Sequence, residues 1–218
     1  LAGYYLTLKA YSGQDDIVIG TSVANRHYNQ IEHLIGFFVN ALALRTKIEQ
    51  RDSIKDFIQK VGQDIIEAQL HQDLPFEKLV EELNVAKDTS RHPIFQVMFG
   101  VQNFGTGLKD HKLLERYASD TSLYNVAKFD ISTFIDDDQE VLRGSFNYAT
   151  SLYKEETIVR FKDTYITILE QIAMAKQDMQ IAELTYLNPE QYKQVLEEWN
   201  ATEREYPRDK TIDQLFEE

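Results

Sequence analysis

Residues 37–45, with the sequence Phe-Phe-Val-Asn-Ala-Leu-Ala-Leu-Arg, carry apolar side chains at nearly every position. Successive side chains of a β-strand point to opposite faces of its sheet, so this strand is apolar on both faces except at Asn40. Such a strand needs cover on both faces, which is the situation in a layered fold. We therefore expect residues 37–45 to form a central strand of a sheet that packs against helices.

Helical and strand-like segments alternate along the rest of the chain. Apolar residues recur at helical spacing in residues 4–11, 54–70, 76–83, 158–172 and 189–199. Shorter strand-like runs occupy residues 17–19, 94–99, 129–135 and 141–148. The last two flank Asp136-Asp137-Asp138-Gln139 and indicate an antiparallel hairpin with an acidic tip. This order predicts an α/β fold, a mixed α+β sandwich in which a mixed sheet carries flanking helices. Residues 105–125 show no clear period and are expected to form a long connection.

Two helix starts can be placed more closely. Asp52 or Ser53 can cap the helix at 54–70. Asp73 is a candidate cap for the next helix, with Pro75 near its first turn. The apolar stripe of the first helix consists of Ile54, Phe57, Ile58, Val61, Ile65 and Leu70.

Composition excludes several classes of protein. A formal net charge of −13 argues against a partner with a phosphate backbone, because such a partner is held by clustered Lys and Arg. No run approaches the roughly 20 apolar residues that cross a bilayer, and the first residues lack a signal-peptide pattern. The chain is therefore expected to be soluble and cytoplasmic, with no nucleic acid or membrane as partner. The absence of cysteine excludes disulfides, thiolate nucleophiles and Cys-ligated zinc.

The common signatures of self-contained enzymes are missing. None of the histidines at positions 27, 33, 71, 92 and 111 has a partner four residues away, so a helical zinc site is disfavoured and no metal is expected. The sequence contains no Gly-x-Ser-x-Gly, Gly-x-x-x-x-Gly-Lys or Gly-x-Gly-x-x-Gly.

Three polar residues occupy positions that require an explanation. An unpaired amide at Asn40 would cost about 1–3 kcal/mol, so it either bonds a neighbouring loop or faces a substrate channel. Arg26 follows a strand end, where it either pairs with a core carboxylate or lines a site. His71 ends an apolar helix and is expected to cap it rather than to act in catalysis.

Three sequence blocks resemble those of condensation domains of nonribosomal peptide synthetases, in the family's order and at about its spacing. The first runs from Ile19-Gly20-Thr21-Ser22-Val23-Ala24-Asn25-Arg26 through Ile35-Gly36-Phe37-Phe38-Val39-Asn40 to Leu44-Arg45. The second is His71-Gln72-Asp73-Leu74-Pro75-Phe76-Glu77-Lys78-Leu79-Val80. The third is Ser90-Arg91-His92-Pro93-Ile94-Phe95-Gln96-Val97-Met98-Phe99. Weaker similarities follow at 128–131 and 148–153, and residues 198–218 resemble the linker into an adenylation domain and that domain's first helix.

This resemblance covers only the second half of the family's domain. Condensation domains consist of two lobes that resemble chloramphenicol acetyltransferase, with a tunnel between them. The resemblance assigns residues 1–186 to the C-terminal, acceptor-side lobe and residues 187–218 to the linker and the start of an adenylation domain. The family's His-His-x-x-x-Asp-Gly motif belongs to the other lobe and is absent here. We therefore expect no catalytic residue in this chain and no activity when it is alone.

The resemblance also implies partners and site residues. In the family, donor and acceptor carrier proteins bring thioesters into the tunnel on phosphopantetheine arms, so no cofactor would bind this lobe directly. The expected partners are the N-terminal lobe, both carrier proteins and the adjacent adenylation domain. By motif match, Asn40 and Arg26 would belong to the tunnel wall nearest the chemistry, with Arg26 structural, and a segment near 148–153 would cross to the other lobe. The remaining motif residues are expected to be structural: His71, Pro75, Phe76, Arg91, Pro93 and Gln96.

Two alternatives remain. A free-standing acyltransferase resembling chloramphenicol acetyltransferase would need its own His-x-x-x-Asp-Gly, which the sequence lacks. A non-catalytic module that binds carrier proteins would differ from the main interpretation only in the absence of a partner lobe.

Overall fold

The computed structural model describes residues 1–26, 28–31, 33–86, 88–102, 126–137 and 142–204, with the single residues 211, 214 and 216. The chain divides into two compact units, Leu1–Tyr186 and Leu187–Glu218. Within the described residues, no helix has the length and apolar character needed to cross a membrane. The histidines at 27 and 111, the 105–125 connection, the second half of the acidic hairpin tip and most of 205–218 lie outside the described residues.

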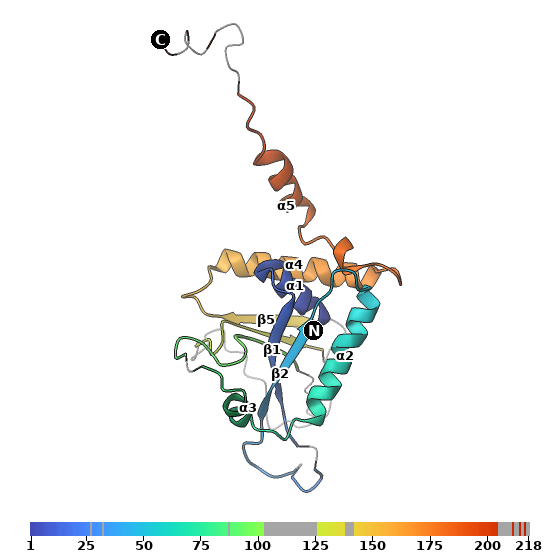
Figure 1. The fold of residues 1–218 in the computed structure, drawn as a ribbon, viewed down its shortest axis with the longest axis vertical. Coiled ribbons are helices and arrows are strands. Elements are labelled where there is room, and N and C mark those ends of the chain that lie inside the picture. The colour runs from blue at the N-terminus through green and yellow to red at the C-terminus, as the bar shows by residue number, and fades with distance from the viewer. Residues whose placement is uncertain are drawn as a thin grey trace, which may run out of the picture. The chain divides into compact units, whose positions relative to one another are not determined.

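The first unit contains one sheet and four helices of two or more turns among its described residues (Figure 1). Its elements are α1 (Ala2–Ser12), β1 (Asp16–Val23), β2 (Asn40–Lys47), α2 (Ile54–Leu70), α3 (Phe76–Glu82), β3 (Val97–Gln102), β4 (Ile131–Asp136), β5 (Arg143–Tyr148), α4 (Glu155–Met174) and the 3-10 turn η2 (Ile181–Glu183). The second unit holds α5 (Pro189–Lys193), which continues into the π-helical turn η3 (Gln194–Glu198). The predicted helix across 189–199 is confirmed, and Asn188 caps it by accepting a hydrogen bond from the Gln191 N–H.

The strands form a mixed sheet in the order β2-β1-β3-β4-β5. The outer pairs, β1 with β2 and β4 with β5, are antiparallel, whereas β3 pairs parallel with both of its neighbours. The predicted α/β class and the antiparallel pairing across the acidic turn are confirmed. The β1–β3 pairing is short, because its register contains only Gly20 opposite Met98.

One core joins helices α1, α2 and α4 to the sheet. Tyr4, Tyr5, Phe57 and Ile168 are fully buried in it, and Ser53 caps α2 by accepting a hydrogen bond from the Asp56 N–H, as predicted. The stripe predicted for α2 is wrong at Ile58 and Leu70, which are 41% and 75% exposed. These positions lie at the apolar margin of the helix, where periodicity alone does not say how far the sheet extends over it.

The expected central position of the 37–45 strand is also wrong. The strand begins at Asn40 and lies at one end of the described sheet. The side-chain pattern of a strand indicates whether its two faces are covered by other parts of the protein. Whether the strand is central depends instead on whether both of its backbone edges form hydrogen bonds with neighbouring strands. Here Leu42 and Leu44 are buried, while the other face carries the small Ala41 and Ala43.

The buried tyrosine hydroxyls of α1 have specific partners. The Tyr5 hydroxyl donates to the Leu44 carbonyl at 2.8 Å, and the Thr133 hydroxyl donates to that of Tyr4 at 3.1 Å. Burial raises the pKa of Tyr5 from 10.0 to about 12 and also raises the pKa of Tyr4. Both groups are therefore neutral in the folded chain at pH values where a tyrosine in the unfolded chain ionises.

We expect the chain to lose stability between about pH 10 and pH 12. Because the folded-state pKa of Tyr5 is raised, its contribution is complete below pH 10 and is lost as the pH rises through about 12. Replacing Tyr5→Phe should cost about 1 kcal/mol at pH 7 and make the alkaline loss shallower. Thermal melts monitored by circular dichroism measure both effects. Tyr192→Phe, at a 58% exposed position, is the control, and equally steep alkaline profiles for Tyr5→Phe and Tyr192→Phe would contradict the assignment.

Candidate functional site

The three sequence blocks meet in one groove of the first unit, with a volume of about 420 Å³. The first block supplies the end of β1 and the start of β2, the second supplies the turn into α3, and the third supplies β3. The lining residues are Ser22, Asn25, Phe37, Phe38, Val39, Asn40, Ala41, Asp73, Pro75, Phe76, Glu77 and Met98. We call this cavity the motif groove.

Asn40 joins the first two blocks. Its Nδ2 donates to the carbonyls of Gln72 and Leu74, both at 2.8 Å, and its Oδ1 accepts from the Phe76 N–H at 3.2 Å. The amide therefore has the loop partners that the structural interpretation requires. Its place in the wall of a substrate tunnel stays a prediction.

The same contacts replace the predicted cap of α3. Pro75, rather than Asp73, is the N-cap residue, and its side chain makes no capping hydrogen bond. Because a proline side chain has no acceptor, the Phe76 N–H at the helix start is satisfied from β2 by Asn40. Local sequence cannot reveal a cap that comes from another element.

Arg26 organises the loop between β1 and β2. Its guanidinium donates to the carbonyls of Ile31, Leu34 and Gly36 at 2.7–3.0 Å, and it lies 4.3 Å from the centre of the Phe38 ring. These contacts fit the predicted structural role. The predicted ion pair with a core carboxylate and the alternative place of Arg26 in a tunnel wall both stay predictions.

An aromatic cluster connects the second and third blocks. Phe95 is 1% exposed and lies 5.3 Å from Phe76, 5.9 Å from His92 and 5.6 Å from Phe129 between ring centres. Its ring also covers Gly20 of β1, where a Cβ atom would stand 2.1 Å from the nearest ring carbon. Gly20 is therefore required by the close approach of an aromatic ring.

The third block enters β3 through an unusual turn. Ile94 has a φ of 68°, a left-handed conformation that is costly for a β-branched residue, so the predicted strand at 94–99 begins only at Val97. The turn is held by the Phe95 N–H, which donates to the Pro93 carbonyl at 2.8 Å, and by Gln96 Nε2, which donates to the His92 carbonyl at 2.9 Å.

Two other motif residues have local roles. Arg91 pairs with Asp88 at 2.8 Å, and hydrogen bonds from Ser90 hold the pKa of that carboxyl below its usual value. His71 is the C-cap residue of α2, and its backbone N–H donates to the Ala68 carbonyl at 3.2 Å; a capping role of its side chain stays a prediction.

The described lining of the motif groove consists of apolar, amide and hydroxyl side chains with two carboxylates, Asp73 and Glu77. No histidine is among the groove-lining residues that the structure describes. Among the residues that the structure describes, no group of three or more His, Asp or Glu side chains could hold a metal. One buried acceptor stands out: Asn25 has a φ of 52°, and its Oδ1 has no hydrogen-bond partner within the described part of the chain.

Sequence reasoning missed Gly20, Phe95 and Asn25 as individual residues. A glycine inside a strand pattern indicates close approach of another group, and that signal could have identified Gly20. The ring that approaches it comes from the third block, 75 residues later in the sequence, so only the tertiary structure identifies Phe95 as the neighbour. Asn25 carries no local signal for its unpaired oxygen.

Comparison with known proteins gives one family and several relatives. A family model described as "Condensation domain" matches residues 1–196. Surfactin synthase subunit 1 of Bacillus subtilis (strain 168) is 38% identical over all of this chain, and gramicidin S synthase 2 of Brevibacillus brevis is 36% identical over all of it. The chain spans 6% and 5% of the lengths of these two proteins.

Solved structures show the same fold. The X-domain from teicoplanin biosynthesis is 25% identical with a TM-score of 0.72, covering 85% of this chain and 43% of that one. A four-domain nonribosomal peptide synthetase bound to AMP and glycine has a TM-score of 0.74 at 22% identity, covering 86% of this chain and 15% of that one. The starter condensation domain of rhizomide synthetase has a TM-score of 0.65 at 19% identity, covering 86% of this chain and 44% of that one.

Proposed function

The chain belongs to the condensation-domain family, and from this premise we propose that it is the C-terminal, acceptor-side lobe of a condensation domain in a nonribosomal peptide synthetase. Such a domain joins two carrier-bound substrates through a peptide bond. The observation that carries the proposal is the convergence of the three sequence blocks on the motif groove, where Asn40 and the Gly20–Phe95 contact fix them together.

The half-domain assignment is supported by coverage and by a missing motif. The chain covers 43% and 44% of the X-domain and starter condensation domain chains. The sequence contains no adjacent pair of histidines, and thus no His-His-x-x-x-Asp-Gly. A second lobe would supply the histidine that serves peptide-bond formation in the family.

The side chains of the loop between β1 and β2 favour an interface with that second lobe. It exposes large apolar side chains beside the motif groove: Phe37 is 90% exposed, and Leu34, Ile35 and Val39 are each at least half exposed. Exposed apolar side chains that are contiguous along a surface favour burial against another protein surface.

In the proposed reaction, the amine of the acceptor aminoacyl group attacks the carbonyl carbon of the donor thioester. A C–N bond forms, the C–S bond breaks, the amine loses a proton and the donor pantetheine leaves as the thiol. This lobe contributes positioning: the motif groove forms one wall of the tunnel, with Asn40 and Arg26 holding its loops. The thioesters arrive on phosphopantetheine arms of two carrier proteins, so the lobe itself needs no cofactor.

The second unit is proposed as the linker into an adenylation domain and the start of that domain. Its capped helix α5 and the turn η3 expose Tyr192, Leu196 and Trp199. These side chains would give a neighbouring domain an apolar contact surface.

Reconstitution from separate lobes tests this proposal. The 218-residue chain alone should not transfer an aminoacyl group between two loaded carrier proteins. Addition of a separately produced N-terminal condensation lobe should give dipeptidyl product, detected by mass spectrometry. A matched mixture whose N-terminal lobe has the second motif histidine replaced by alanine should give none.

Two results would count against the proposal. Product from the chain alone would contradict the half-domain assignment and favour a free-standing acyltransferase. If the two lobes neither bind one another nor form product, although the chain is folded by circular dichroism, the chain acts as a module without this partner.

A further inference from the structure

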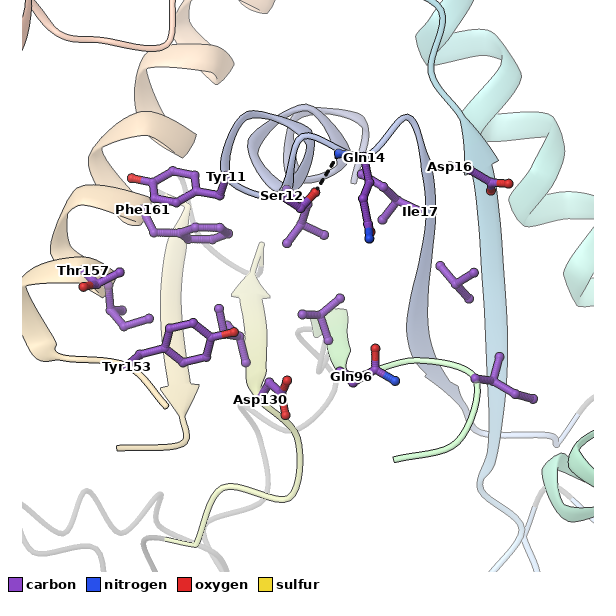
Figure 2. Close-up of a pocket in the computed structure, with 16 residues that line it drawn as sticks. Tyr11, Ser12, Gln14, Asp16, Ile17, Gln96, Asp130, Tyr153, Thr157 and Phe161 are labelled. Carbon is purple, nitrogen blue, oxygen red and sulfur yellow. Dashed lines mark hydrogen bonds between the residues drawn. The ribbon is translucent and has the colours of Figure 1, made fainter. Parts of the chain in front are cut away.

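A second cavity of about 500 Å³ opens at the start of the parallel strands (Figure 2). Among the described residues, it shares no lining residue with the motif groove. It arises because β1 and β3 are paired only at Gly20 and Met98, so the earlier residues of β1 diverge from the segment that leads into β3. Its buried apolar floor consists of Ile17, Ile131, Ile158 and Phe161.

Polar groups line this cavity on two sides. Figure 2 shows Asp130, Gln96 and Tyr153 on one side, with Ser12 and Gln14 on the other. None of the 16 lining residues within the described part of the chain is basic. A cavity of this size, with an apolar floor and a few convergent polar groups, has the general form of a small-molecule site.

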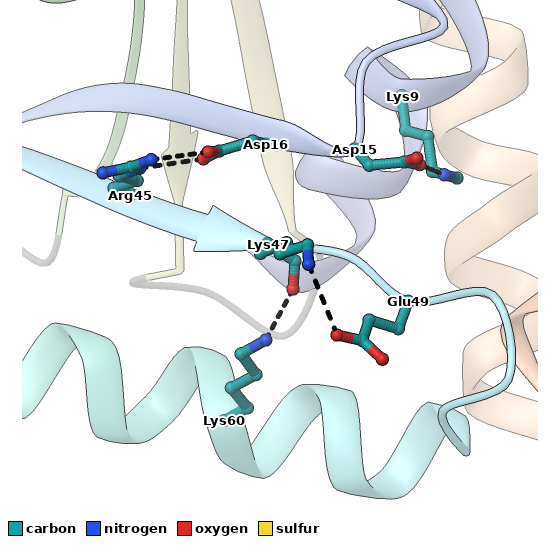
Figure 3. A network of polar contacts seen from close by, with 7 residues as sticks. All are labelled: Lys9, Asp15, Asp16, Arg45, Lys47, Glu49 and Lys60. Carbon is teal, nitrogen blue, oxygen red and sulfur yellow. Dashed lines mark hydrogen bonds and ion pairs between the residues drawn. The ribbon is translucent and has the colours of Figure 1, made fainter.

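The two carboxylates of the cavity, Asp16 and Asp130, differ in whether a basic side chain pairs with them. Asp16 forms a bidentate pair with Arg45, with distances of 2.9 and 2.6 Å (Figure 3). The backbone of Asp130 is engaged, since its N–H donates to the Gln96 carbonyl and its carbonyl accepts from Ala149. Its carboxylate has no hydrogen-bond or ion-pair partner among the described residues. The cavity therefore contains one half-buried carboxylate, that of Asp130, for which the described residues supply no ion-pair partner.

The neighbouring Tyr153 supports a ligand that donates hydrogen bonds. Burial and the nearby Asp130 carboxylate raise the pKa of Tyr153 above that of an ordinary tyrosine, whose hydroxyl is already neutral at physiological pH. Its oxygen and the side-chain oxygen of Gln96 are further acceptors beside the carboxylate.

We propose that this cavity binds a small organic cation, a primary ammonium group carried on an apolar body. The ammonium would donate to the Asp130 carboxylate and the neighbouring oxygens, and the apolar body would lie on the isoleucine and phenylalanine floor. Charge-assisted hydrogen bonds are stronger than neutral ones and favour the cation over a neutral analogue of the same shape. The site is separate from the motif groove and does not depend on the proposed condensation function.

Binding of benzylammonium to the whole chain tests the proposal, with benzyl alcohol as the neutral analogue. In NMR spectra of isoleucine δ1-methyl groups, benzylammonium should shift Ile17, Ile94, Ile131 and Ile158 in a saturable way. Ile66, 60% exposed on α2, should not move. The neutral analogue should bind at least about tenfold more weakly.

Variants then assign the charge. Asp130→Asn should weaken benzylammonium binding about tenfold, whereas Asp178→Asn, at an exposed carboxylate outside the cavity, should leave the affinity unchanged. If Asp130→Asn does not fold, the isoleucine δ1-methyl shifts of the unaltered chain still test whether benzylammonium binds in the cavity. Absence of saturable shifts, shifts that do not include the cavity methyls, or equal binding of benzyl alcohol would overturn the proposal. Equal affinity of a folded Asp130→Asn variant would do so as well.

Discussion

Replacing Gly20 with alanine is expected to lower the free energy of unfolding by about 3 kcal/mol, the upper part of the range for overpacked cores. The added Cβ would stand 2.1, 2.4 and 2.5 Å from three carbon atoms of the Phe95 ring. That ring is 1% exposed and is confined by Phe76, His92 and Phe129, so it cannot rotate into solvent. Relief requires movement of β1 away from the third sequence block.

Urea unfolding followed by circular dichroism measures the effect, and Gly62→Ala is the matched control. Gly62 lies within α2, and a Cβ atom added there would have no neighbouring heavy atom within 4 Å outside the backbone of its own helix. Alanine at this position should stabilise the chain by about 0.5–1 kcal/mol, because it favours the helix. The two Gly→Ala changes should therefore alter the free energy of unfolding in opposite directions. That result would show that the Phe95 contact, rather than the intrinsic cost of a methyl group, causes the destabilisation by Gly20→Ala.

A double-mutant cycle separates the contact from a general weakness of β1. With Gly20→Ala already present, Phe95→Leu should cost less than in the unaltered chain, because the smaller side chain relieves the clash. Strict additivity of the two changes would mean that the alanine and the ring do not meet, and it would contradict the proposed cause.

Local sequence signals are sufficient to place the helices along the chain and to identify two of their caps. Ser53 and Asn188 accept from the third residue that follows them, Asp56 and Gln191, which is the capping geometry expected of serine and asparagine. The acidic turn before residue 143 separates two strands that do pair antiparallel. Each of these features depends on residues within about ten positions, so the sequence contains the relevant information.

The errors arise where a residue's partner lies far along the chain. The apolar pattern of 37–45 records the cover on the faces of β2, but it cannot say that one backbone edge has no neighbour in the described sheet. Local pattern places the cap of α3 within its own turn, whereas the cap comes from Asn40, 36 residues earlier. The left-handed Ile94 precedes β3, and the Phe95 ring that follows it covers Gly20; no local propensity for a strand reveals either feature. Three sequence blocks indicate the candidate site through their family resemblance. Their convergence on one groove can be seen only in the tertiary structure.

Replacing Asn40 with alanine is expected to destabilise the chain by about 2–4 kcal/mol. Three hydrogen bonds are lost together, and the change orphans the Gln72 and Leu74 carbonyls and the Phe76 N–H. Asn40→Asp should not rescue the loss: a carboxylate can still accept from Phe76, but it cannot donate to two carbonyls and places a negative charge against them. Asn29→Ala, at an exposed position of the preceding loop, is the control for stability. The melting temperature and urea midpoint measure these changes.

The same variant distinguishes the two interpretations of Asn40 once the chain is paired with an N-terminal lobe. If the amide only clamps the turn at 72–76, the rate of dipeptidyl transfer should be unchanged at a temperature where the Asn40→Ala lobe is fully folded, despite a melting temperature lower by several degrees. If Asn40 also lines the tunnel, transfer should fall about tenfold or more under those conditions, with lobe association unaltered. Unchanged transfer by the folded variant would exclude the tunnel role, and an unchanged melting temperature would exclude the clamp.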